Sequence, residues 1–142
     1  GAKGRRGNYE IELGAAGVGR AGGAGRILPY GTMVRGCRAV VGEAGGDAGI
    51  VDRRTLVPLD VDAIEASVKK TGRCMIVHEA TRTSGFGAEL SALVQERCFY
   101  HLVAPIARVT GFDTPYPHSL EWAYFAGPVR IGEALKKIMK DA

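Results

Sequence analysis

A histidine and a glutamate come directly after a continuous apolar run. Residues 74–77 read CMIV and are followed by His78 and Glu79. Four apolar residues in succession predict a strand that is buried on both faces. Ligands of open parallel sheets bind at the carboxyl ends of the strands. There His78 could exchange protons near neutral pH, and Glu79 could orient it or bind a cation. Alternatively, both side chains only anchor the following loop by hydrogen bonds.

A second polar cluster lies in a loop with two prolines. Residues 113–118 read DTPYPH; the prolines fix the backbone, and Asp113 can cap the turn. His118 taken alone is more typical of a structural role than of a catalytic one. With His78 and Glu79, we take Arg82, Asp113 and His118 as the candidate polar site.

Aromatic residues gather in the same loop, which spans residues 111–128 and which we call the aromatic loop. Tyr116, Trp122, Tyr124 and Phe125 are large, rigid rings, and three of them carry polar groups. Such a loop either packs over the sheet or is presented to a partner. The four residues form the candidate interface.

Two further patterns are weaker indications of a functional site. Residues 17–22 match G-x-G-x-x-G, but a strand-like segment follows them, so no helix N-terminus is available for a pyrophosphate. Cys37, Cys74 and Cys98 lie far apart and outside any CxxC pattern. They are typical of reduced, buried and inert thiols.

The elements that must position these residues alternate along the chain. Strands are expected at 9–13, 27–30, 48–53, 74–77 and 105–109, and helices at 32–44, at 61–70, after Thr83 or Ser84, and from 128. Residues 14–25 predict a loop or weak edge structure. Alternation of this kind indicates an α/β domain with a mostly parallel sheet and helices on both faces. The expected core includes Ile64, Met75, Val77, Leu90, Val94 and Leu135.

Composition divides the chain into two parts. Of its 142 residues 21 are glycine, and 15 of these lie in the first 50 positions. We expect a glycine-rich lead-in over 1–25 and one domain over 26–142. The net charge of +4 is too small to indicate nucleic-acid binding. No apolar run approaches the roughly 20 residues that span a bilayer.

Several motifs carry a family resemblance. They are VHEA at 77–80, GFGAEL at 85–90, VQE at 94–96 and APIARVTG at 104–111, with YGTMV at 30–34 and RTLVPLD at 54–60 upstream. Together they resemble the C-terminal transketolase-like domain of 2-oxo acid dehydrogenase β subunits. FDTPYPH at 112–118 is similar to the branched-chain (2-oxoisovalerate) members. Several positions depart from the family pattern, among them the segment 25–29, Ala21, Ala24 and Ala126. Two of the departures are arginines: Arg38 replaces an apolar residue and Arg53 a leucine, so both must reach solvent or find partners.

The resemblance implies a three-layer α/β fold of about five strands, mostly parallel, with one antiparallel edge strand. It also implies part of a thiamine-diphosphate-dependent enzyme, 3-methyl-2-oxobutanoate dehydrogenase. Such enzymes decarboxylate a branched-chain 2-oxo acid and transfer the acyl group to a lipoyl arm. Their thiamine diphosphate and Mg lie between the α subunit and the N-terminal domain of β. We therefore expect no catalytic, cofactor-binding or metal-binding residue in this chain, and no activity of the chain alone.

The implied role is assembly and docking. The expected partners are an α subunit and a second β subunit in an α2β2 heterotetramer, and the dihydrolipoyl acyltransferase core, with no nucleic acid or membrane. The expected location is the bacterial cytoplasm or the mitochondrial matrix. The alternatives are a β-subunit domain of pyruvate or acetoin dehydrogenase, or a stand-alone ligand-binding or interaction module on the same fold.

Overall fold

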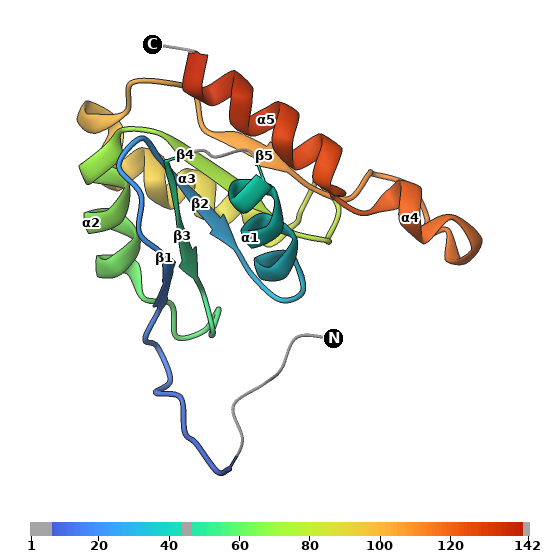
Figure 1. Ribbon diagram of the computed structural model, residues 1–142, viewed down its shortest axis with the longest axis horizontal. Helices are drawn as coiled ribbons and strands as arrows, with labels where there is room; N and C mark the ends of the chain where they lie inside the picture. The colour runs from blue at the N-terminus through green and yellow to red at the C-terminus, as the bar shows by residue number, and fades with distance from the viewer. Residues whose placement is uncertain (1–6, 44–46, 141–142) are drawn as a thin grey trace.

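A mixed sheet forms the centre of the molecule. The computed structural model describes residues 7–43 and 47–140 (Figure 1). Its strands are β1 (Gly17–Arg20), β2 (Gly25–Pro29), β3 (Ala48–Asp52), β4 (Cys74–Val77) and β5 (Ala107–Val109). They lie in the order β1-β3-β2-β4-β5, with β1 antiparallel to β3 and the other neighbours parallel. The expectation of about five mostly parallel strands with one antiparallel edge is confirmed.

Helices cover both faces of this sheet. They are α1 (Met33–Glu43), α2 (Val61–Thr71), α3 (Phe86–Cys98), α4 (Glu121–Tyr124) and α5 (Pro128–Lys140), with single 3-10 turns η1 (Phe99–His101) and η2 (His118–Leu120). One buried cluster joins the sheet to α1 and α5, and a second joins it to α2 and α3. All six expected core residues are buried. Among the described residues no helix is long and apolar enough to cross a membrane.

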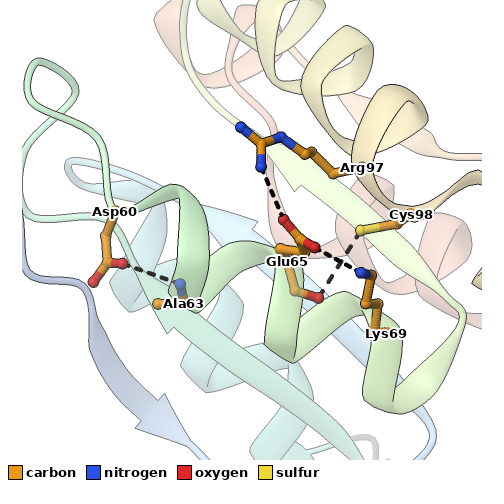
Figure 2. Close-up of polar contacts among 6 residues, drawn as sticks. All are labelled: Asp60, Ala63, Glu65, Lys69, Arg97 and Cys98. Carbon is orange, nitrogen blue, oxygen red and sulfur yellow. Dashed lines mark hydrogen bonds and ion pairs between the residues drawn. The ribbon is translucent and has the colours of Figure 1, made fainter.

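Helix α2 begins and ends at residues that are typical of helix ends. The Asp60 carboxylate accepts a hydrogen bond from the Ala63 N–H at 3.0 Å, as an N-cap does. Gly72 ends the helix with a left-handed φ of +67°. Figure 2 shows the polar contacts that follow on its surface: Glu65 lies between Lys69 of the same helix, at 2.6 Å, and Arg97 of α3, at 3.5 Å.

The first strand begins later than expected. Residues 9–13 form no strand, and β1 instead lies within the glycine-rich segment. Gly17 pairs with Asp52, the last residue of β3. Residues before Gly17 therefore have no neighbouring strand to pair with, whatever their alternation.

The start of α3 also differs from its expectation. Neither Thr83 nor Ser84 caps the helix; Gly85 is the N-cap residue and makes no side-chain hydrogen bond. A Cβ at Gly85 would lie 2.1 Å from the Thr81 carbonyl oxygen, so the close approach requires glycine. The Gly87 N–H of the first turn donates to His78 Nε2 at 3.2 Å. His78, the residue that follows β4, thus accepts a hydrogen bond that a capping side chain next to the helix would otherwise accept.

Candidate functional site

The carboxyl ends of β2 and β4 mark the point where the sheet connections diverge. β2 leads into α1 on one face, and β4 leads into α3 on the other. In open α/β sheets, ligands bind at such a point. Thr32, after β2, donates its hydroxyl hydrogen to the Glu79 carboxylate after β4. The ring of Tyr30 stacks on His78 with centroids 5.6 Å apart.

The contacts of His78 are those of a structural residue. Its side chain is 0% exposed, and Nε2 accepts the Gly87 N–H. Burial lowers the pKa of His78; Arg53 and Arg108 act in the same direction, and the Ala80 backbone opposes them. The ring is therefore neutral at pH 7, and its one acceptor nitrogen holds the first turn of α3. This geometry favours anchoring over general-base chemistry.

Arg53 lies buried beside Tyr30, the residue that follows β2. Its side chain is 3% exposed and donates from Nη2 to the Leu28 carbonyl oxygen, while Cζ lies 5.0 Å from the centre of the Tyr30 ring. Its Nε and Nη1 atoms have no hydrogen-bond partner in the described part of the chain. Burial is the main cause that lowers the pKa of Arg53, to about 10. Of the two arginines that depart from the family pattern, Arg38 is exposed to solvent and Arg53 is not.

We expect Arg53→Leu to raise the free energy of unfolding by about 1–3 kcal/mol. Replacing a buried charged group by an apolar one of similar volume removes a desolvation cost. Part of this gain is offset because the Leu28 carbonyl loses its donor. Urea unfolding measures the difference, with Arg54→Leu at the exposed neighbouring position as the control, expected within about 0.5 kcal/mol of the parent. If Arg53→Leu lost 1 kcal/mol or more, the hydrogen bond and ring contact would outweigh the cost of burial.

One member of the candidate polar site, Asp113, joins the loops after β4 and β5. The Asp113 carboxylate accepts from the Thr83 N–H at 2.8 Å and from the Thr83 hydroxyl at 2.7 Å. These hydrogen bonds lower the pKa of Asp113, and nearby Arg82 adds to the effect. His118 instead packs edge-on against Tyr116, at 5.0 Å between centroids. Among the described residues no contact joins His118 to His78 or Glu79.

The aromatic loop divides into a buried and an exposed part. Tyr124 is 6% exposed and packs against Phe112, Tyr116 and Phe125. Its ring lies 2.7 Å from where a Cβ of Gly111 would be, so it closes over the loop after β5. Trp122, in contrast, is 80% exposed on α4, which projects away from the sheet (Figure 1). Of the four candidate interface residues, Tyr124 is buried and packs over the loop after β5, and Trp122 has the largest exposed fraction.

The described residues hold no cluster suited to a metal or a reactive thiol. No group of three or more His, Cys, Asp or Glu side chains among them could hold a metal ion. All three cysteines are buried, and burial raises the pKa of Cys37 and Cys74 to about 12. Thiolates are therefore not available at neutral pH. Residues 17–22 lead from β1 towards β2 and not into a helix.

Comparisons with known proteins agree with this architecture. The family model described as "Transketolase, C-terminal domain" matches residues 14–131. The 2-oxoisovalerate dehydrogenase subunit beta of Pseudomonas aeruginosa is 60% identical over 134 residues, which are 94% of this chain and 38% of that protein. The mitochondrial counterpart from Dictyostelium discoideum is 44% identical over 137 residues, 94% of this chain and 37% of that protein. The chain thus spans less than two fifths of the length of these relatives.

A solved structure confirms the fold. The structure titled "Split gene transketolase, inactive beta4 tetramer" superposes with a TM-score of 0.80 at 21% identity, covering 94% of this chain and 44% of that one. The sheet order, the two helical layers and the family match over residues 14–131 lead to one conclusion. The chain belongs to the transketolase C-terminal domain family.

Proposed function

We propose that this chain is the assembly domain of the β subunit of a branched-chain 2-oxo acid dehydrogenase. The observation that carries the proposal is the 60% identity with a 2-oxoisovalerate dehydrogenase subunit beta over 94% of the chain. The resemblance of FDTPYPH at 112–118 to the branched-chain members points the same way. The enzyme would oxidatively decarboxylate 2-oxoisovalerate and pass the acyl group to a lipoyl arm.

Catalysis in this proposal takes place outside the chain. Thiamine diphosphate would supply the carbanion chemistry of decarboxylation when bound, and Mg would hold its diphosphate. The described residues do not fit either group. The turn that opens α3 contains Gly85 and Gly87, but Thr81 and His78 fill the space beside them, so it offers no room for a diphosphate. No group of three or more His, Cys, Asp or Glu side chains among the described residues could hold Mg. As the family resemblance implies, we place both groups between an α subunit and the N-terminal domain of the β subunit.

What this chain contributes is a partner surface. Four large apolar side chains here are each at least 40% exposed: Phe112, Tyr116, Leu120 and Trp122. The rings of Phe112 and Tyr116 pack against the buried Tyr124. The Tyr124 side chain and the Tyr116–Glu121 hydrogen bond hold this surface in place. Tryptophan and tyrosine on a preorganised segment are the residue types that dominate binding at interface centres. The α subunit, the second β subunit of an α2β2 tetramer and the acyltransferase core are the partners we propose for it.

Trp122→Ala tests this role. We expect association with the α subunit to weaken by about 2 kcal/mol or more, roughly 30-fold in dissociation constant, because an interface tryptophan is lost. The melting temperature of the domain should change by only a few degrees, because Trp122 packs against little of it. Sedimentation of the complete β subunit with its α subunit measures the first quantity, and calorimetry measures the second.

Tyr100→Ala provides the matched control. Tyr100 is also an exposed aromatic residue, but it lies on η1, outside the aromatic loop. It should leave association unchanged. If Trp122→Ala associated normally, Trp122 would not belong to the interface. If its melting temperature fell by much more than a few degrees, Trp122 would instead pack against the domain itself.

A further inference from the structure

A hollow of about 320 Å³ lies between the edge strand β5 and helix α5. Arg82, Arg108 and Lys137 contribute its cations, and Ile106, Ala134 and Ile138 contribute much of its apolar wall. A neighbouring hollow of about 330 Å³ shares Arg108, Ala134 and Lys137 and adds Arg130 and Glu133. We call the first hollow the β5–α5 groove.

The cations of the β5–α5 groove form no ion pair with another described residue. Both ion pairs in the described part of the chain are made by Glu65, on the other face of the sheet. Asp113 lies near Arg82, but its two carboxylate oxygens accept hydrogen bonds from Thr83. Glu133 lines the neighbouring hollow together with Arg130 and Lys137, but it forms no ion pair with either. Three positive charges thus line one small groove.

The guanidinium groups of Arg82 and Arg108 are each held by a hydrogen bond and keep further N–H groups for a ligand. Arg82 donates from Nη1 to the Arg108 carbonyl oxygen at 3.1 Å, and Arg108 donates from Nη1 to the Arg82 carbonyl oxygen at 3.3 Å. Each keeps further N–H groups that no side chain or carbonyl among the described residues accepts. A planar guanidinium fork binds a carboxylate through paired hydrogen bonds. The arrangement is therefore preorganised for an anion.

We propose that the β5–α5 groove binds a small organic acid. Its carboxylate lies on Arg82, Arg108 and Lys137, and a short aliphatic body packs against Ile106, Ala134 and Ile138. The volume lies at the lower end of the range for small-molecule sites, which suits a body of a few carbon atoms. The site is distinct from the aromatic loop, and the proposal does not depend on the assembly role.

A titration of the 142-residue chain with isovalerate, followed by amide NMR, tests this site. Isovalerate should shift the amides of residues 106–108 and 134–138. Isovaleramide has the same body without the charge, and inorganic phosphate has charge without the body, so both should bind at least fivefold more weakly. Equal binding of isovaleramide, equal binding of phosphate, or shifts confined to other elements would each overturn the proposal.

Charge-removing variants test the residues. Arg108→Gln and Lys137→Gln should each weaken isovalerate binding at least fivefold. Lys70→Gln is the control: it removes the same charge from an exposed position at the end of α2 and should change binding less than twofold. Lys137 has no hydrogen bond or ion pair among the described residues, so Lys137→Gln remains informative if Arg108→Gln unfolds. Unchanged affinity in Lys137→Gln would overturn the proposed carboxylate position.

Discussion

Gly87→Ala should destabilise the domain by about 2–4 kcal/mol. A Cβ at this position would lie 2.2 Å from His78 Nε2 and 2.6 Å from its Cδ2. The His78 ring is fully buried and stacked on Tyr30, so it cannot move aside cheaply. Overpacking of this kind costs about 1–3 kcal/mol. The displaced ring also loses the Gly87 N–H, which adds about 1 kcal/mol. Urea unfolding at pH 7 measures the total.

Gly42→Ala is the matched control for backbone effects. Gly42 also lies within a helix, α1, but a Cβ there would meet nothing within 4 Å. This variant should gain about 0.5–1 kcal/mol, because alanine is the better helix former. Opposite signs for the two variants would isolate the contact with His78. A loss below 0.5 kcal/mol in Gly87→Ala would show that α3 does not begin against this ring.

A double-mutant cycle sharpens the test. In a His78→Ala background the ring is gone, so Gly87→Ala should cost much less than it does in the parent. Residues in direct contact show coupling free energies of about 0.5–3 kcal/mol, and we expect this pair to lie in the upper half of that range. Additive effects would contradict the proposed close packing.

Features set by local patterns could be predicted from the sequence. The run at 74–77 forms the buried strand β4, and Asp60 caps α2, because each depends on residues within one turn or one strand. The expected core was confirmed for the same reason, since periodicity alone decides which face of a helix is apolar. The direction of the edge strand came from the family resemblance and not from periodicity.

Features set by distant partners could not be predicted. The start of α3 depends on His78, nine residues earlier in the chain, and the start of β1 depends on where β3 ends. Arg53 is buried because its carbonyl partner is Leu28, 25 residues away. The β5–α5 groove exists because residues near 82, 106 and 137 meet in space. No local pattern carries that information.

The aromatic loop shows the same limit within a single segment. Tyr124 and Trp122 lie two residues apart, and residue type alone does not show which of the two rings is buried. The short helix α4 turns one ring onto Gly111 and the other into solvent. Their roles separate only once the path of the loop is known, and Trp122 is therefore the residue whose substitution tests the interface.

Leu90→Ala should lower the free energy of unfolding by about 2–5 kcal/mol. Leu90 is 0% exposed on α3 and belongs to the buried cluster that includes Ile64, Val68 and Ile76. Truncating a leucine in such a core removes transfer free energy and leaves a cavity that the neighbours fill only in part.

Leu93→Ala is the control on the same helix. Leu93 is only partly buried at the edge of the cluster, so the same change in side chain should cost clearly less. Helix propensity changes equally in both variants, and the difference between them therefore reports packing alone. Chemical denaturation with a shared m-value measures that difference. Equal losses, or a loss below about 0.5 kcal/mol for Leu90→Ala, would mean that α3 presents a different face to the sheet.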